Sequence, residues 1–160
     1  MRIHDDFDYV YNEYSKSLFN IAYGYLKNKD DSADIVQTVF LKALSKNIDF
    51  NSYDEIKFYL IRITINCSLD LLKSNYKKKM VLNNEIALNI KDSSNIDSSN
   101  LNLMVAIDKL NPKYKTIIIL YYYELLSIKD IASTLKISID ATKKRLERAK
   151  KMIKTYIERN

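Results

Sequence analysis

The chain of 160 residues, 47% of them apolar, is long enough for one ordinary domain or for two small helical ones. One glycine and one proline disfavour hairpin-rich β folds and any glycine-rich phosphate loop, and one cysteine with one histidine cannot form an internal disulfide or a Cys/His metal site. The net charge of +6 favours an acidic partner, and no apolar run reaches the roughly 18 residues that a membrane span requires.

The charge is distributed unevenly along the chain. Residues 1–55 carry a net charge of −4, residues 56–82 +5, residues 83–103 −2 and residues 104–160 +7. Two basic blocks separated by acidic ones indicate a nucleic-acid-binding protein with two contact surfaces. On charge alone, a lysine-rich surface that only keeps a helical protein soluble explains the pattern equally well.

The N-terminal block begins MRIHDDFDYV, with acids where a signal peptide carries basic residues and an apolar stretch, so we expect a cytoplasmic protein. Apolar residues recur at spacings of three and four from Phe7 to Leu26 and predict one long amphipathic helix. Asp31 or Ser32 is the expected cap of a second helix, whose polar side points away from the core.

A third helix is expected from about Glu55 to the lysine cluster that ends at Lys79. Its broad apolar content predicts that it lies largely buried, with Cys67 as a core residue rather than a nucleophile. Residues 83–100 are rich in Asn, Ser and Asp and lack a helical period, which predicts a flexible linker. The prediction is an all-α protein of two small helical domains, residues 1–82 and residues 101–160.

The second domain is expected to begin with a helix at Leu101 and to continue, after Asn111 and Pro112, with a helix over residues 113–125. We expect the three consecutive tyrosines 121–123 mainly in the core, although a base-stacking platform is the alternative.

Two further helices are predicted to form a helix-turn-helix. Ser127 with Asp130 fits a helix-starting box, and Ser138 is a natural cap for a last helix that runs to about Arg159. The turn between them carries Lys136 near the place where such turns usually have glycine. The predicted apolar stripe of the last helix comprises Ile139, Thr142, Leu146, Ala149, Ile153, Tyr156 and Ile157. The cations on its other side suit the major groove of duplex DNA.

Motifs in both halves resemble those of bacterial sigma factors of the extracytoplasmic-function (ECF) group. LFNIAYGYL, ADIVQTVFLKAL and LIRITINCSLDLLK are similar to the family's region 2, and LNPKYKTIIILYYYELLSIKDIASTLKISIDATKKRLERAKK is similar to region 4. The resemblance covers nearly the whole chain, with no room for a region 3 domain. It implies a promoter-specificity subunit that binds core RNA polymerase at the β′ clamp helices and the β flap, with promoter DNA and an anti-sigma factor as further partners. It implies no catalytic residue, metal, cofactor or small-molecule substrate.

The resemblance also assigns residues to surfaces. The second helix would contact the polymerase, and the third helix with its preceding loop would open and read the minus-10 element, with an unstacked base held by the loop. The last helix would read the minus-35 element. The implied polymerase contacts are Asp34, Gln37, Thr38 and Leu41. The implied minus-10 contacts are Phe50, Asn51, Tyr53, Lys57, Tyr59, Arg62, Asn66, Lys73 and Lys77. The implied minus-35 contacts are Ser138, Asp140, Ala141, Lys143, Lys144, Arg145, Arg148 and Lys151.

The sequence departs from the family pattern at several of these places. Tyr59 stands where tryptophan is usual, and it suits core packing as well as DNA contact. Ile65 stands where the family commonly has an arginine, which removes one expected phosphate contact. Asp140 would repel phosphate, but it can accept a hydrogen bond from a cytosine amino group.

Two other functions compete with the sigma factor. A stand-alone helix-turn-helix regulator would bind operator DNA by itself, usually as a dimer, yet no coiled-coil seam is evident. A helical adaptor or an anti-sigma-like protein would use its basic faces only for solubility. An enzyme is the least favoured reading, because no carboxylate pair, triad or metal cluster has supporting spacing.

Overall fold

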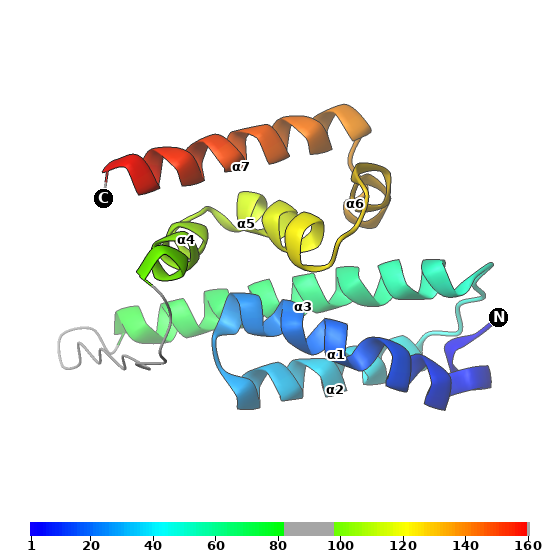
Figure 1. Ribbon diagram of the computed structural model, residues 1–160. Coiled ribbons are helices and arrows are strands. Elements are labelled where there is room, and N and C mark those ends of the chain that lie inside the picture. The colour runs from blue at the N-terminus through cyan, green and yellow to red at the C-terminus, as the bar shows by residue number, and fades with distance from the viewer. Residues whose placement is uncertain (82–97, 160) are drawn as a thin grey trace.

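In the computed structural model of the chain, which describes residues 1–81 and 98–159, every regular element is a helix. The predicted all-α class is therefore confirmed. Figure 1 shows three helices of the N-terminal half lying alongside one another, α4, α5 and α6 beside them, and α7 on the far side. We call the elements from η1 to α3 the first domain and those from α4 to α7 the second domain.

The first domain is a bundle of three helices in mutual contact, preceded by one short 3₁₀ helix. Its elements are η1 (Ile3–Asp6), α1 (Phe7–Leu26), α2 (Lys29–Ser45) and α3 (Tyr53–Val81). The helix predicted over residues 7–26 has those bounds, and Cys67 is buried as expected. The 3₁₀ turn at the N-terminal end was not predicted, because four residues are too few to show a helical period.

The cap of α2 was predicted wrongly. The helix begins at Lys29, and the side chain of Asn28 accepts a hydrogen bond from the Asp31 N–H at 2.9 Å. Ser32 is instead buried within the helix, with its hydroxyl donating to the Asn28 carbonyl at 2.6 Å. The chain leaves α1 through Lys27 in the left-handed conformation (φ 53°), so a turn of only two residues separates the helices and puts the cap at Asn28.

The first helix of the second domain begins three residues earlier than the predicted start at Leu101. Its elements are α4 (Ser98–Asp108), α5 (Pro112–Ile118), the π-helical turn η2 (Ile119–Tyr123), α6 (Ile128–Leu135) and α7 (Ile139–Arg159). The last three residues of the predicted linker, 98–100, thus belong to α4, and its residues 83–97 lie outside the described part of the chain. Asn111 caps α5 by accepting the Lys113 N–H at 3.1 Å, with Pro112 at the first helical position.

The expected regular helix over residues 113–125 ends instead in a π-helical turn. The Glu124 N–H donates to the Ile119 carbonyl at 3.0 Å, and Leu125 then takes the left-handed conformation (φ 57°). This irregular end changes which side chains face the core. Tyr122 is 48% and Tyr123 61% exposed, so the prediction that the tyrosines mainly fill the core is wrong for these two.

The helix-turn-helix is formed as predicted. The Ser127 hydroxyl oxygen accepts the Asp130 N–H, and the Ser138 hydroxyl oxygen accepts the Ala141 N–H, both at 3.0 Å. Lys136 adopts the left-handed conformation (φ 56°) that glycine would normally supply. The predicted stripe of α7 is buried at its centre, at Thr142, Leu146 and Ala149, whereas its two ends, Ile139 and Ile157, are exposed.

The buried side chains of the two domains form one continuous cluster. At Gly24 of α1 the two domains approach closely, since an added Cβ would lie 3.1 Å from Cδ1 of Ile119. Helix α3 of the first domain also contacts α6 of the second domain. The two domains therefore pack directly against each other.

Candidate nucleic-acid interface

The exposed side of α7 is strongly basic. Thr142, Leu146 and Ala149 anchor one side of the helix in the domain, which leaves the other side to solvent. Arg145 is half-buried at the edge, and the side chains that are exposed on this surface are Asp140, Lys143, Lys144, Arg148 and Lys151. Lys151 lies 3.9 Å from Glu147, but this exposed pair contributes little and leaves the cation available.

The start of α7 is held in place by the turn before it. Ile137 N–H donates to the Ala132 carbonyl at 3.0 Å, which closes α6 and fixes the direction in which the chain enters α7. Ser138 is occupied as the helix cap, and Ala141 is half-buried behind it. Of the residues implied near base edges, Asp140 and Lys144 thus have free side chains.

A second basic stripe runs along α3. Its side chains are spaced three, four, seven and four residues apart, which places them on one side of the helix. They are Tyr59, Arg62, Asn66, Lys73 and Lys77. Asn66, Lys73 and Lys77 are exposed. The helix has 29 residues, so the stripe extends over most of its length of about 43 Å.

The N-terminal end of this stripe is less open than the rest. Tyr59, Arg62 and Lys57 are half-buried, and the Arg62 guanidinium lies 6.0 Å from the centre of the Tyr59 ring. Burial raises the pKa of the Tyr59 hydroxyl, an effect that the charge of Arg62 partly opposes. Phe50, Glu55, Tyr59 and Arg62 border a hollow of about 320 Å³ that is also lined by Ser133 and Thr134 of α6.

The loop before α3 is braced by neighbouring segments. Phe50 is only 8% exposed and packs against Tyr59 at 5.3 Å between ring centres, so here its ring supports the loop and is not free to contact DNA. The Tyr53 hydroxyl donates to Asp6 at 2.7 Å, and the Tyr14 hydroxyl donates to the Tyr53 carbonyl at 3.3 Å. The Asn51 N–H donates to Glu55 at 2.6 Å, and the exposed Asn51 side-chain amide also donates to the Glu55 carboxylate at 3.5 Å.

Ile65 explains one departure from the family pattern. It is buried in the core of the first domain, beside the fully buried Thr64. An arginine at this point of α3 would have to extend out of the core before it reached phosphate.

The exposed side of α2 has the opposite character. Asp34, Gln37, Thr38 and Leu41 are all exposed, and their spacing of three and four residues places them on one stripe. Leu41 is 69% exposed, and Leu44 beside it is exposed as well. A stripe with one carboxylate, Asp34, and exposed leucines suits contact with a protein better than contact with DNA phosphates.

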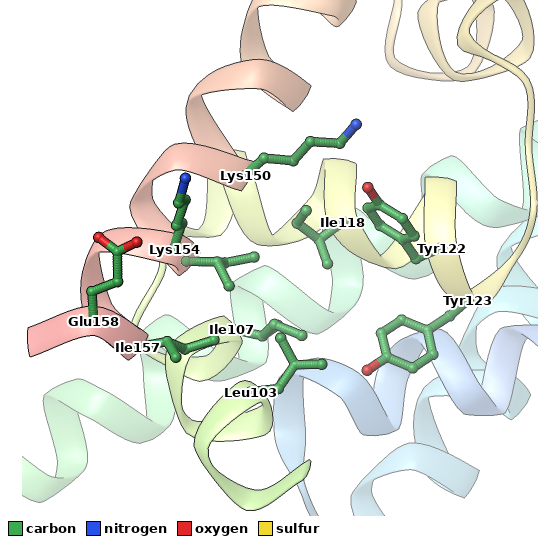
Figure 2. Close-up of a pocket in the computed structure, with 10 residues that line it drawn as sticks. Leu103, Ile107, Ile118, Tyr122, Tyr123, Lys150, Lys154, Ile157 and Glu158 are labelled. Carbon is green, nitrogen blue, oxygen red and sulfur yellow. The ribbon is translucent and has the colours of Figure 1, made fainter. Parts of the chain in front are cut away.

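An apolar groove of about 620 Å³ lies in the second domain, between α4, η2 and the C-terminal end of α7 (Figure 2). Ile107, Ile118 and Ile153 line it, with Tyr122 and Tyr123 on one side. Lys150 stands at its edge, 5.9 Å from the centre of the Tyr122 ring. The sequence did not predict this groove, because its walls come from the four elements α4, α5, η2 and α7, and Tyr122 and Tyr123 reach it from the π-helical turn.

No helix within residues 1–81 and 98–159 has the length and apolarity needed to cross a membrane. In the same residues, no group of three His, Cys, Asp or Glu side chains is arranged to hold a metal ion.

A helix-turn-helix with a basic reading helix, together with a second basic helix on another domain, defines the class of DNA-binding transcription factors. The sequence matches Sigma-70 region 2 over residues 10–78 and Sigma-70 region 4 over residues 100–153. The chain belongs to the ECF group of RNA polymerase sigma factors, and it is an alternative sigma factor that directs transcription initiation. Proteins of this family are DNA-binding initiation factors rather than enzymes.

Individual relatives support this assignment. The RNA polymerase sigma factor SigV of Bacillus subtilis (strain 168) is 30% identical over 145 residues, which cover 91% of this chain and 87% of SigV. The ECF RNA polymerase sigma factor SigW of the same strain is 24% identical over 168 residues, covering 96% of this chain and 89% of SigW. The fold is similar to that in the co-crystal structure of the sigma factor RpoE with the anti-sigma factor NepR from Bartonella quintana. That similarity has a TM-score of 0.71 at 19% identity, over 96% of this chain and 97% of the other.

Proposed function

We propose that the two domains of this sigma factor divide promoter recognition between them. Residues 1–82 bind core RNA polymerase and read and open the minus-10 element, residues 101–160 read the minus-35 element, and residues 83–100 link them. The observation that carries this proposal is the exposed basic surface of α7, held by a capped helix-turn-helix on a different domain from the basic stripe of α3.

At the minus-35 element, α7 lies in the major groove with its N-terminal end toward the base edges. Lys144 and Arg148 can donate to guanine, and Asp140 can accept from a cytosine amino group. The proposed phosphate contacts on either side of the groove are Lys143, Arg145 and Lys151, and Ser138 and Ala141 at the helix start would lie close to the DNA backbone.

At the minus-10 element, the half-buried pair Tyr59 and Arg62 and the exposed Asn51 surround the place where an unstacked base would lie. Tyr53 holds the loop, while Lys57, Asn66, Lys73 and Lys77 follow the separated strand along α3. Phe50 supports this site from within the core.

Two surfaces are available to core polymerase. The stripe Asp34, Gln37, Thr38 and Leu41 on α2 would bind the β′ clamp helices, since its charge and exposed leucine suit a basic and apolar protein partner. The apolar groove of the second domain would bind the β flap. An anti-sigma factor is the second expected partner, because an inhibitor that covered either surface would prevent polymerase binding. These partners place the protein in the cytoplasm.

Run-off transcription with purified core polymerase on fragments of the source genome tests the proposal. We expect discrete transcripts only when the protein is added, and their absence from every template would contradict it. Gel shifts with and without core polymerase distinguish a sigma factor from a stand-alone regulator, because a stand-alone regulator would bind operator DNA tightly without core polymerase. Asp34→Lys should reduce association with core, whereas Asp8→Lys, an equal change of charge at an exposed position of α1, should not.

A further inference from the structure

The hollow at the N-terminal end of α3 is bordered by a carboxylate, that of Glu55, which is absent from the predicted minus-10 contacts. The volume of the hollow, about 320 Å³, is near the lower limit of pockets that hold small molecules, so it suits a single nucleic-acid base. Phe58 and Tyr59 line it, and aromatic rings are the surfaces on which unpaired bases stack. The charged side chains that border it are Asp49, Glu55 and Arg62.

The two carboxylates of the hollow differ in their partners. Asp49 forms an ion pair with the Met1 ammonium, whose hydrogen bond lowers the pKa of the Asp49 carboxyl. Among the residues that the structure describes, none forms an ion pair with Glu55. Glu55 is therefore the carboxylate that can accept hydrogen bonds from a ligand in this hollow.

The two oxygens of the Glu55 carboxylate are engaged unequally. Oε2 accepts the Asn51 N–H at 2.6 Å, whereas Oε1 lies 3.5 Å from the Asn51 side-chain nitrogen, at the outer limit of a hydrogen bond. A carboxylate can accept about four hydrogen bonds, so Oε1 retains the capacity to accept another. The Glu55 N–H donates to the Ser52 hydroxyl at 3.2 Å, and this cap fixes Glu55 at the start of α3.

Arg62 supplies donors at the same hollow. Its guanidinium lies 6.0 Å from the centre of the Tyr59 ring and carries five N–H donors. No carboxylate in the described part of the chain forms an ion pair with it. The hollow thus combines an acceptor from Glu55, donors from Arg62 and an aromatic wall.

This set of groups discriminates among the four bases. An unstacked base is read at its Watson–Crick edge. Adenine, cytosine and guanine each carry an exocyclic amino group beside a ring nitrogen that accepts, which matches a carboxylate next to a guanidinium. Thymine has no amino group, and its single ring N–H lies between two carbonyl oxygens that a carboxylate repels.

We infer that Glu55 selects the unstacked minus-10 base, with Oε1 accepting a hydrogen bond from the amino group of adenine, cytosine or guanine and with thymine disfavoured. The inference rests on the proposed assignment of this hollow to the minus-10 element. Arg62 donates to the neighbouring ring nitrogen, and Tyr59 supports the face of the base. Glu55 thereby determines specificity, whereas phosphate contacts from the lysines along α3 carry no sequence information.

The variant Glu55→Gln tests this role in the full chain bound to core polymerase. The glutamine carbonyl can still accept the Asn51 N–H, whereas its amide nitrogen replaces Oε1 and converts an acceptor into a donor. Run-off transcription is measured on templates that carry each of the four bases in turn at every minus-10 position. The wild type should disfavour thymine at the selected position by at least about fivefold, and the variant should lose this preference there and keep the wild-type pattern elsewhere.

Asp54→Asn is the matched control, because it makes the same change at a neighbouring exposed carboxylate that does not border the hollow. It should keep the wild-type pattern at every position. An unchanged pattern in Glu55→Gln would overturn the inference. An equal loss of transcription on all templates would also overturn it, since Glu55 would then serve only to hold the start of α3. Failure of the wild type to transcribe any template would instead contradict the proposed function.

A change in the DNA tests the same contact without altering the protein. At the selected position, 2-pyrimidinone in place of cytosine, purine in place of adenine or hypoxanthine in place of guanine removes only the amino group. The wild type should transcribe the modified template at least about fivefold less, although weaker base pairing would by itself favour opening of the duplex. Glu55→Gln should transcribe both templates alike. Equal transcription of both templates by the wild type would show that no amino group is read and would overturn the inference.

Discussion

The two long basic helices of this protein are held in different ways. Helix α3 contacts both other helices of its domain and α6 of the second domain, whereas α7 packs by one side only and leaves the other to solvent. The proposed reading surface of α7 is therefore open to solvent, whereas the proposed minus-10 surface on α3 is partly covered by α6. This difference fits the proposed roles, because α3 has to serve as part of the core of its domain as well as bind separated strands, whereas a helix that enters intact duplex needs only a firm support behind it.

The comparison predicts that the largest effects on stability come from α3. Leu60→Ala removes a fully buried side chain from the middle of this helix and should lower the free energy of unfolding by about 2 to 5 kcal/mol. Leu41→Ala, an exposed leucine on α2, is the control and should change it by less than about 0.5 kcal/mol. Chemical denaturation followed by circular dichroism measures both, and equal effects would show that α3 is not the centre of the core.

On α7 the comparison predicts the reverse: a loss of function without a loss of stability. Lys144→Ala and Arg148→Ala should each reduce transcription. If the side chain contacts a base, the loss of promoter-binding free energy should be about 1 to 3 kcal/mol, while the melting temperature stays unchanged. Lys109→Ala, an exposed cation on the same domain, is the control. Run-off transcription under identical salt conditions gives the comparison, because cation effects depend on salt. Unchanged transcription in both variants would favour the view that these faces only confer solubility.

The helices and the helix-turn-helix could be predicted because their signals are local. The apolar period of Phe7–Leu26 and the serines at 127 and 138 fix their elements through neighbours a few residues away. The predicted need to form the turn at Lys136 without glycine was also met, by a left-handed lysine. Such features depend on backbone geometry and capping, which act within one or two helical turns.

What could not be predicted depends on contacts between distant residues. The exposure of Tyr122 and Tyr123 follows from a π-helical turn, and the burial of Phe50 from its contact with Tyr59. The bridge from Lys27 to Asp108 joins residues that lie far apart in the sequence. No periodicity or motif encodes such pairings, so the groove and the domain contact appear only once the chain is folded.

The turn of the helix-turn-helix offers a smaller effect that sharpens the view of α7. Lys136 pays a steric penalty in the left-handed region, so Lys136→Gly should raise the free energy of unfolding by roughly 0.5 to 1 kcal/mol. Lys136→Ala removes the same charge but keeps the Cβ, so it should give no such gain. Thermal unfolding of the three proteins measures the difference. A gain in the alanine variant equal to that in the glycine variant would assign the effect to charge.

The smallest predicted effect concerns Glu124 at the domain contact. Burial raises the pKa of its carboxyl above the ordinary value of 4.5, because the hydrogen bond from Ser17 and the charge of Lys57 offset desolvation only in part. The folded protein thus holds this proton more readily than the unfolded chain, so the carboxylate destabilises the fold once the pH rises above its pKa. Glu124→Gln removes the charge but retains an acceptor for Ser17, and should stabilise the protein at pH 7 by less than about 1 kcal/mol after solvent screening.

At pH 4, where Glu124 is protonated, the melting temperatures of variant and wild type should converge, whereas a gain that persisted there would assign the effect to packing. Glu147→Gln, an exposed site on α7, should show little effect at either pH and so separates the domain contact from the open helix.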